Sequence, residues 1–210
     1  MIQIELNNLG KRFSREWILR GLTTSIAKNE KLVITGANGS GKSTLLQIIA
    51  GYVLPTEGEL KWKLQNGNVI NHDSIYKYVT IASPMLELIE EFTPIEIINH
   101  QNEFKKFQNN LSVKELLEIA LLHQHKNKTI KHFSSGMKQR LKLLLAVVAD
   151  APLLLLDEPI INLDKTGVEW YKNLISNYAN NKTIIVCSNK IKDEYDYCTR
   201  EISIDEYKKV

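Results

Sequence analysis

The sequence predicts an α/β fold in which helices flank a mostly parallel sheet, with an antiparallel β portion near the N-terminus and an inserted helical subdomain. Three observations favour this class. Short apolar runs separated by turn residues fill the first third of the 210 residues, good helix formers dominate residues 94–124, and strand and helix patterns alternate in the last third. Strands that alternate with helices are typical of a parallel sheet.

The elements of the α/β body follow from periodicity and turn residues. Strands are expected at 2–6, 22–27 and 31–35, a glycine-rich loop at 36–41, a helix at 43–50, a hairpin at 59–70 and a strand at 76–82. A helix at 135–149, a strand at 153–156, a helix at 164–178 and a strand at 183–187 follow later in the chain. The body therefore comprises residues 1–83 and 133–210, and the helical subdomain comprises residues 84–132.

Two helices are expected in the subdomain. Pro94 suits the first turn of one helix, and Ser112 with Glu115 forms a capping box that opens the next. Histidines and lysines crowd residues 123–132, including His123 and His125. A metal site there is a weak hypothesis, because no carboxylate or cysteine lies nearby. A polar, solvated connection is the favoured interpretation.

The composition is that of an ordinary globular protein. Hydrophobic residues make up 43% and charged residues 24%, which excludes intrinsic disorder and a fibrous fold. The net charge of +3 is too small to indicate binding to nucleic acid or to anionic lipid, so no nucleic-acid partner is expected. The length fits one large domain or two small ones. We expect a single domain, residues 1–210.

Cysteine usage and hydropathy bear on location. The two cysteines, Cys187 and Cys198, are too few for a disulfide framework and favour a reducing compartment. The most apolar stretch, residues 141–156, contains Lys142 and Asp150 and is shorter than the roughly 20 apolar residues of a membrane-spanning helix. The N-terminus carries no signal pattern. We therefore expect a cytoplasmic chain without a membrane span of its own.

A phosphate-binding loop is the strongest signal. The residues Gly36, Ala37, Asn38, Gly39, Ser40, Gly41, Lys42, Ser43 and Thr44 match G-x-x-x-x-G-K-[ST] in full, between an apolar strand and an amphipathic helix. Glycines let successive backbone N–H groups curl around phosphate oxygens, and the helix N-terminus adds its positive dipole end. Lys42 is expected on the β- and γ-phosphates of a nucleotide, and the Ser43 hydroxyl on Mg²⁺.

Two carboxylates follow the apolar run at 153–156. Asp157 and Glu158 come at the C-terminal end of a buried strand, where ligands bind in open α/β sheets. Asp157 is expected to hold Mg²⁺, and Glu158 to polarise a water aimed at the γ-phosphate. Together with the phosphate loop, the pair indicates a P-loop NTPase. A P-loop kinase is a weaker alternative, because it has no use for residues 133–140.

A third segment narrows the class. Phe133-Ser134-Ser135-Gly136-Met137-Lys138-Gln139-Arg140 precedes the acidic pair, with Ser134 lying 23 positions before Asp157. With the other two motifs, this segment resembles the nucleotide-binding subunit of an ATP-binding-cassette (ABC) transporter. The resemblance extends over residues 2–204, with the motifs in the family's order and at about its spacing.

The resemblance implies roles for further residues. The segment with Ser134, Ser135, Gly136 and Met137 corresponds to the family signature, L-S-G-G-Q, which faces the nucleotide held by another subunit. Asp164 corresponds to the D-loop aspartate, although it would also serve as a plain helix N-cap. The aromatic residue that stacks on adenine is assigned to Phe13, with Trp17 in reserve.

Two residues usual in the family are missing. Ser83-Pro84 stands where the family has a Gln that touches Mg²⁺ and the attacking water, and Asn189 stands where it has a His. An Asn side chain hydrogen-bonds phosphate but carries no charge, and charge-assisted bonds are roughly twice as strong as neutral ones. The sequence therefore predicts slow hydrolysis.

The expected function is that of an ATPase subunit. Two copies, or this chain and a second cassette, would close face to face on two ATP molecules and drive transport through a separate membrane-spanning partner. By resemblance, the partner docks around residues 85–97 and holds the chain on the inner face of the membrane. The alternative is an ATP-gated cassette that hydrolyses slowly or not at all within a soluble complex.

Overall fold

The computed structural model describes residues 1–207. These residues form two compact units, which are described separately. The sheet unit contains Met1–Ile81, Pro152–Glu158 and the chain from Asn181 onward, and the helical unit contains Ala82–Ala151 and Pro159–Asn180. The helical unit is wider than the subdomain expected at 84–132, because the two long helices that follow that segment pack with it.

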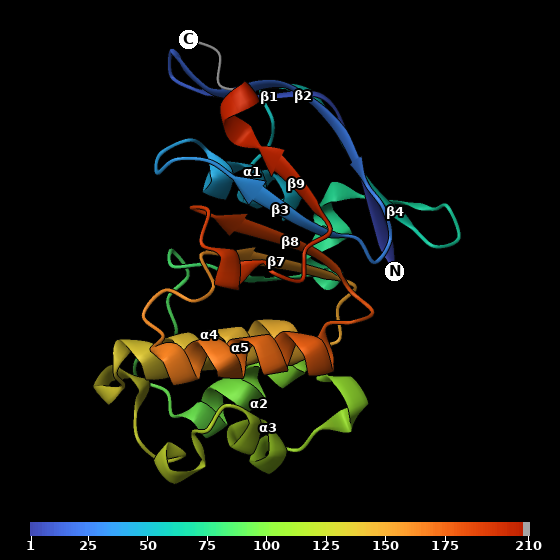
Figure 1. Ribbon diagram of the computed structural model, residues 1–210. Helices are drawn as coiled ribbons and strands as arrows, with labels where there is room; N and C mark the ends of the chain where they lie inside the picture. Colours follow the sequence, from blue (N-terminus) through green and yellow to red (C-terminus); the bar gives the residue numbers. More distant parts are fainter. Residues whose placement is uncertain (208–210) are drawn as a thin grey trace. The chain divides into compact units, whose positions relative to one another are not determined.

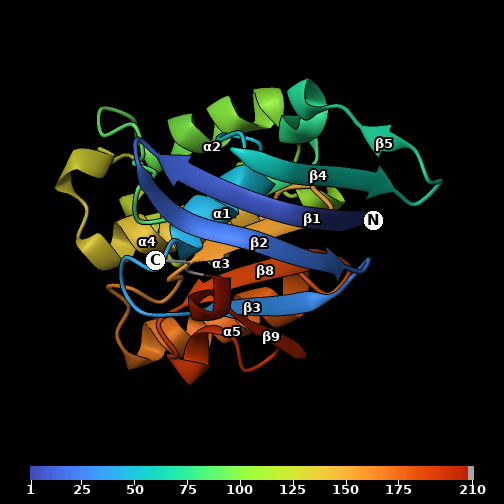
Figure 2. The same ribbon diagram turned by 90° about the horizontal axis from the view of Figure 1, so that it is seen from above.

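An antiparallel sheet forms one layer of the sheet unit. Its strands are β1 (Ile2–Phe13), β2 (Glu16–Ile26), β4 (Glu57–Leu64) and β5 (Val69–Ile70), in the order β2-β1-β4-β5. Figure 2 shows this sheet lying over α1 (Lys42–Ile49). The Trp62 indole N–H donates to the Ile49 carbonyl over 3.0 Å and so ties β4 to the end of that helix.

A parallel sheet forms the second layer of the sheet unit. Its strands are β6 (Val79–Ala82), β7 (Leu153–Asp157), β8 (Thr183–Ser188), β3 (Lys31–Thr35) and β9 (Arg200–Ser203), in the order β6-β7-β8-β3-β9. All side chains of β7 and β8 are buried, as their continuous apolar runs require. The core of this unit consists of the inward faces of both sheets and the apolar face of α1.

The helical unit contains α2 (Pro94–Phe104), α3 (Val113–Ile119), α4 (Ser135–Val148) and α5 (Lys165–Tyr178). The helices α4 and α5 lie side by side, and α2 packs against both α3 and α4 (Figure 1). Capping boxes begin α2 at Thr93 and α3 at Ser112, so each cap satisfies two backbone N–H groups.

Short 3₁₀ helices complete the chain. In the sheet unit they span His72–Lys77, Lys192–Glu194 and Ile204–Tyr207, and in the helical unit Gln108–Asn110, His123–His125 and Ile130–His132. No helix within residues 1–207 combines the length and apolarity needed to cross a membrane.

The predicted fold class is confirmed, with four local corrections. The first strand extends to Phe13, and the second begins at Glu16 rather than at residue 22. Tyr76 belongs to the 3₁₀ helix and not to a strand, because the turn that begins at Asn71 continues through it. The strand β9 was not predicted, since its sequence, Arg-Glu-Ile-Ser, has one apolar residue and lies at the sheet edge.

Candidate active site

The phosphate loop joins β3 to α1 in the sheet unit. Its glycines are required by geometry, because Gly39 and Gly41 have φ values of 75° and 99°. A Cβ on Gly41 would lie 2.5 Å from Ile18 Cγ2. Ala37, Asn38 and Gly39 are exposed at the tip, and Ser43 and Thr44 are half-buried in the first turn of α1. The loop therefore presents its backbone N–H groups at a helix N-terminus, as an anion site requires.

The Lys42 ammonium is held over its own loop. Its Nζ donates to the carbonyls of Gly36 and Ala37, over 2.9 Å and 3.0 Å, and to Asn189 Oδ1 over 2.7 Å. Lys42 is 5% exposed, so this cation is largely removed from solvent. Three acceptors match the three N–H donors of the ammonium.

Asn189 connects Lys42 to Glu158. Its Nδ2 donates to Glu158 Oε1 over 2.6 Å, while its Oδ1 accepts from Lys42. The two partners dictate the orientation of the amide, since Lys42 only donates and an ionised Glu158 only accepts. We call this arrangement the Asn189 bridge. It brings together residues from α1 and from the ends of β7 and β8.

The strand register explains the position of Glu158. The parallel strands β7 and β8 pair Asp157 with Cys187, so their carboxyl ends meet at one edge of the sheet. The Glu158 N–H donates to the Cys187 carbonyl over 3.0 Å. Glu158 has a φ of 46°, an uncommon conformation for a residue with a side chain, and such strain clusters at functional sites.

The residues assigned to nucleotide and Mg²⁺ have suitable chemistry. Ser40 Oγ is buried and has no hydrogen-bond partner within residues 1–207, so a phosphate oxygen would satisfy it. Asp157 is 4% exposed and offers carboxylate oxygens, and Ser43 offers a hydroxyl. No group of three His, Cys, Asp or Glu side chains in the described part of the chain could hold a metal. Few protein ligands suit Mg²⁺, which keeps waters and binds substrate phosphates.

The signature segment begins α4 in the helical unit. Ser134 is the N-cap, and its Oγ accepts from the Met137 N–H over 3.2 Å. Ser135 is the first residue of the helix and has no positive φ, so it replaces the usual glycine without strain. A Cβ on Gly136 would lie 3.2 Å from the Asn162 carbonyl oxygen, which favours glycine at that position.

Asp164 is the N-cap of α5. Its Oδ1 accepts from the Gly167 N–H over 2.7 Å and from Thr166 Oγ1 over 2.8 Å. The bond from the Gly167 backbone is the main reason that the pKa of Asp164 is lowered. The plain capping role is therefore present, and Asp164 also borders the hollow beside Ser134 and Gly136.

The two candidate adenine contacts flank the β1–β2 turn. Phe13 is 48% exposed, with Lys11 Nζ 4.8 Å from its ring centroid. Trp17 contacts two guanidinium groups, with Arg12 Cζ at 5.3 Å and Arg20 Cζ at 4.5 Å from its ring. The Phe13 ring is the one that leaves the larger fraction of its surface exposed.

No carboxamide follows β6, where the family has its Gln. Ser83 is buried, and its Oγ accepts from the Met85 N–H over 3.3 Å, while Pro84 has no N–H. The next Gln, Gln101, lies in α2 and donates to the Leu145 carbonyl over 2.7 Å.

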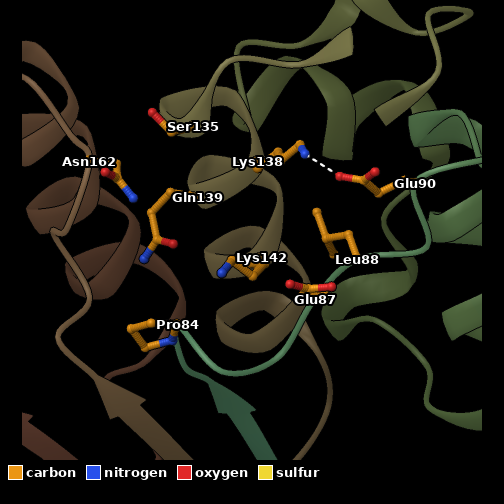
Figure 3. A pocket seen from close by; sticks show the side chains of 9 residues that line it. All are labelled: Pro84, Glu87, Leu88, Glu90, Ser135, Lys138, Gln139, Lys142 and Asn162. Carbon is orange, nitrogen blue, oxygen red and sulfur yellow. Dashed lines mark hydrogen bonds and ion pairs between the residues drawn. The ribbon is translucent and has the colours of Figure 1, made fainter. Parts of the chain in front are cut away.

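The helical unit also contains polar residues that sequence reasoning missed. Pro84 lines a pocket with Gln139 and Lys142 of α4 (Figure 3). Gln139 is 3% exposed and donates to the Pro159 carbonyl over 2.7 Å. Burial lowers the pKa of Lys142. Nearby side chains in the segment 85–97 are apolar and exposed, namely Met85, Leu86 and Ile89.

The fold and the site define a P-loop NTPase. A family model described as "ABC transporter" matches residues 19–161. The chain therefore belongs to the ABC transporter family, in which it is an ATP-binding cassette protein.

Individual relatives agree with this assignment. The chain is 31% identical over 174 residues to an uncharacterized ABC transporter ATP-binding protein, YcbN, of Bacillus subtilis, covering 81% of this chain and 55% of that protein. It is 31% identical to ABC transporter I family member 1 of Arabidopsis thaliana, covering 86% of this chain and 79% of that protein. The dimeric post-hydrolysis structure of the ATP-binding cassette MJ0796 with ADP and Pi is 26% identical, with a TM-score of 0.79 and coverage of 95% and 93%.

Proposed function

We propose that the chain binds and hydrolyses Mg-ATP in a face-to-face dimer and so drives transport through a separate membrane-spanning partner. The observation that carries the proposal is the Asn189 bridge, which holds the phosphate-loop Lys42 and the candidate base Glu158 in one hydrogen-bonded chain. A cation for the phosphates and a carboxylate for the water are the two groups that this hydrolysis needs most.

Nucleotide binding, activation of the attacking water and Mg²⁺ binding are assigned to different residues of this chain. The backbone N–H groups of residues 36–44, the buried Ser40 hydroxyl and Lys42 bind the triphosphate, and Phe13 stacks on adenine. Glu158 accepts a hydrogen bond from the attacking water and draws its proton away as the oxygen approaches the γ-phosphorus. Ser43 and Asp157 would hold Mg²⁺, which supplies charge neutralisation on the phosphate oxygens. Asn189 keeps Glu158 oriented.

The dimer completes each site. The signature residues from Ser134 to Met137 form an exposed to half-buried helix N-terminus, a surface suited to the γ-phosphate of a nucleotide bound by a second subunit. Asp164 of the D-loop lies in the same hollow. We assign the segment 85–97, with its exposed Met85 and Ile89, to the membrane-spanning partner, which holds the chain on the inner face of the membrane.

A second candidate is an ATP-gated cassette that hydrolyses slowly or not at all. The observation favouring it is the absence of a carboxamide at Ser83-Pro84, where Ser83 Oγ instead caps its own turn. Water positioning would then depend on Glu158 alone. Co-purification from native membranes, with identification of the attached chains, separates a transporter from a soluble complex.

Glu158→Gln tests the proposal. Gln keeps an oxygen that accepts from Asn189, so the bridge and ATP binding should persist while hydrolysis is nearly abolished. The variant should form a dimer in Mg-ATP, measured by size-exclusion chromatography with light scattering. Lys42→Ala in the same background is the matched control and should remain monomeric. A Glu158→Gln variant that stays monomeric and turns over ATP normally would contradict both the role of Glu158 and the dimer.

A further inference from the structure

Lys11 makes two contacts near the end of β1 in the sheet unit. Its Nζ donates to the carbonyl of Leu54, in the segment that follows α1, over 2.8 Å. The same ammonium lies over the Phe13 ring, 4.8 Å from the ring centroid. A cation within about 6 Å of such a centroid is attracted by the negative charge on the ring face. The proposed function gives Lys11 no role, although it assigns Phe13 to adenine.

The backbone on both sides of Lys11 is fixed to the segment that follows α1. The Thr56 N–H donates to the Gly10 carbonyl over 2.8 Å, and the Arg12 N–H donates to the Thr56 hydroxyl oxygen over 3.0 Å. Lys11 is also half-buried, so its side chain has less freedom than that of an exposed lysine. These bonds fix the point from which the side chain reaches over the Phe13 ring.

This end of the β1–β2 hairpin lies next to the phosphate loop. Phe13 pairs with Glu16, and Ile18 follows two residues later on β2, at a distance of about 7 Å along the strand. A Cβ on Gly41 of the loop would lie 2.5 Å from Ile18 Cγ2. The Phe13 ring, which is 48% exposed, is therefore at a distance that a nucleotide with its phosphates in the loop can bridge.

We infer that Lys11 is a positioning residue for the base of the bound nucleotide. The inference rests on the stacking of Phe13 on adenine in the proposed function. The ammonium occupies one face of the Phe13 ring, and the base takes the other. Two aromatic rings repel each other when their negative faces meet squarely. A cation on the far face draws electron density away from the near face and keeps the ring oriented, so the base stacks more strongly.

The test compares Mg-ADP with inorganic pyrophosphate, which has phosphates but no base. Lys11→Met keeps a long, flexible side chain and removes its charge. Lys28→Met is the matched control, because Lys28 is also half-buried, donates to the Gln65 carbonyl over 3.2 Å and lies beyond the far end of β2. The dissociation constant of radiolabelled ADP is measured directly, and that of pyrophosphate by its displacement of the label.

A cation–π contact at an exposed site contributes about twofold to fivefold to an equilibrium constant. Lys11→Met should therefore weaken ADP binding by about twofold to fivefold and leave pyrophosphate binding unchanged. Lys28→Met should change neither. In a Phe13→Leu background, which has already lost the ring, Lys11→Met should weaken ADP binding no further.

Three results would overturn the inference. One is ADP binding by Lys11→Met that is as tight as that of the natural chain. Another is an equal loss with pyrophosphate, which would mean that the charge acts on the phosphates. The third is a further loss in the Phe13→Leu background, which would mean that Lys11 acts without the ring. A Phe13→Leu variant that binds ADP as tightly as the natural chain would instead contradict the stacking in the proposed function, so the two failures are distinguished.

Discussion

Replacing Asn189 with Leu tests the bridge most directly. Leu has nearly the size of Asn but neither donates nor accepts, so Lys42 loses one of its three acceptors and Glu158 loses its 2.6 Å donor. The half-buried carboxylate of Glu158 is then free to rotate away from the attacking water. The expected result is a slower chemical step with little change in ATP binding.

The magnitude follows from the bond that is lost. A hydrogen bond to a charged group contributes about 1.5–3 kcal/mol. If the free energy of this hydrogen bond is lost in full from the transition state, kcat falls by about 10-fold to 150-fold, because each 1.36 kcal/mol corresponds to a factor of ten. Lys42 keeps its bonds to the Gly36 and Ala37 carbonyls, so KM should change by less than about threefold.

The assay is steady-state phosphate release across a range of Mg-ATP concentrations, with Lys192→Ala, a substitution of an exposed charge near Asn189 in the sequence, as the control.

Asn189→His is measured in the same assay. An imidazole both accepts and donates, and it can also carry charge, so we expect kcat to rise about tenfold with KM little changed. Unchanged turnover in Asn189→Leu, or slower turnover in Asn189→His than in the natural chain, would refute the reasoning.

Three further predictions concern the rest of the chain. Lys42→Ala should abolish ATP binding at micromolar concentrations in equilibrium binding with labelled nucleotide, because the phosphates lose their nearest fixed cation; unchanged affinity would mean that the phosphate loop is misassigned. Thr93→Ala removes the N-cap of α2 and should lower the free energy of unfolding in urea by about 1 kcal/mol, whereas an exposed control such as Lys128→Ala should not. Burial raises the pKa of Cys198 to about 12, so its thiol stays neutral at pH 8. Alkylation of Cys198 at pH 8 should therefore be about 1,000-fold slower in the folded protein than in urea-unfolded protein. Equal alkylation rates would show that the thiol is accessible and ionised in the folded protein.

Most of the fold could be predicted because its elements carry strong local signals. Apolar runs gave β3, β7 and β8, which are buried on both faces, and the capping box at Ser112 gave the start of α3. The strand β9 was not predicted, because it lies at the edge of the sheet and its sequence has one apolar residue. The 3₁₀ helix at His72–Lys77 was not predicted, because the aromatic Tyr76 favours a strand when it is considered without the turn that precedes it.

The candidate site was predictable where a motif fixes the backbone. The spacing of the phosphate loop specifies a turn with positive φ at Gly39 and Gly41, and the structure has that turn. The positive φ of Glu158 could not be predicted, since it depends on the bond from its N–H to Cys187 in the neighbouring strand.

The geometry changes how the two missing family residues should be weighed. From sequence alone, Asn189 counts as a loss beside the usual His. In the structure its amide faces a cation on one side and an anion on the other, and it has one group for each. Only the charge and the longer reach of a His are therefore missing at this position. At Ser83-Pro84, in contrast, neither residue has a carboxamide side chain, and the Ser83 hydroxyl accepts a hydrogen bond from the Met85 N–H of its own turn. If hydrolysis is slow, the missing Gln at Ser83-Pro84 should account for more of the reduction in rate than Asn189 does. The tenfold gain expected from Asn189→His should therefore restore only the smaller part of that rate.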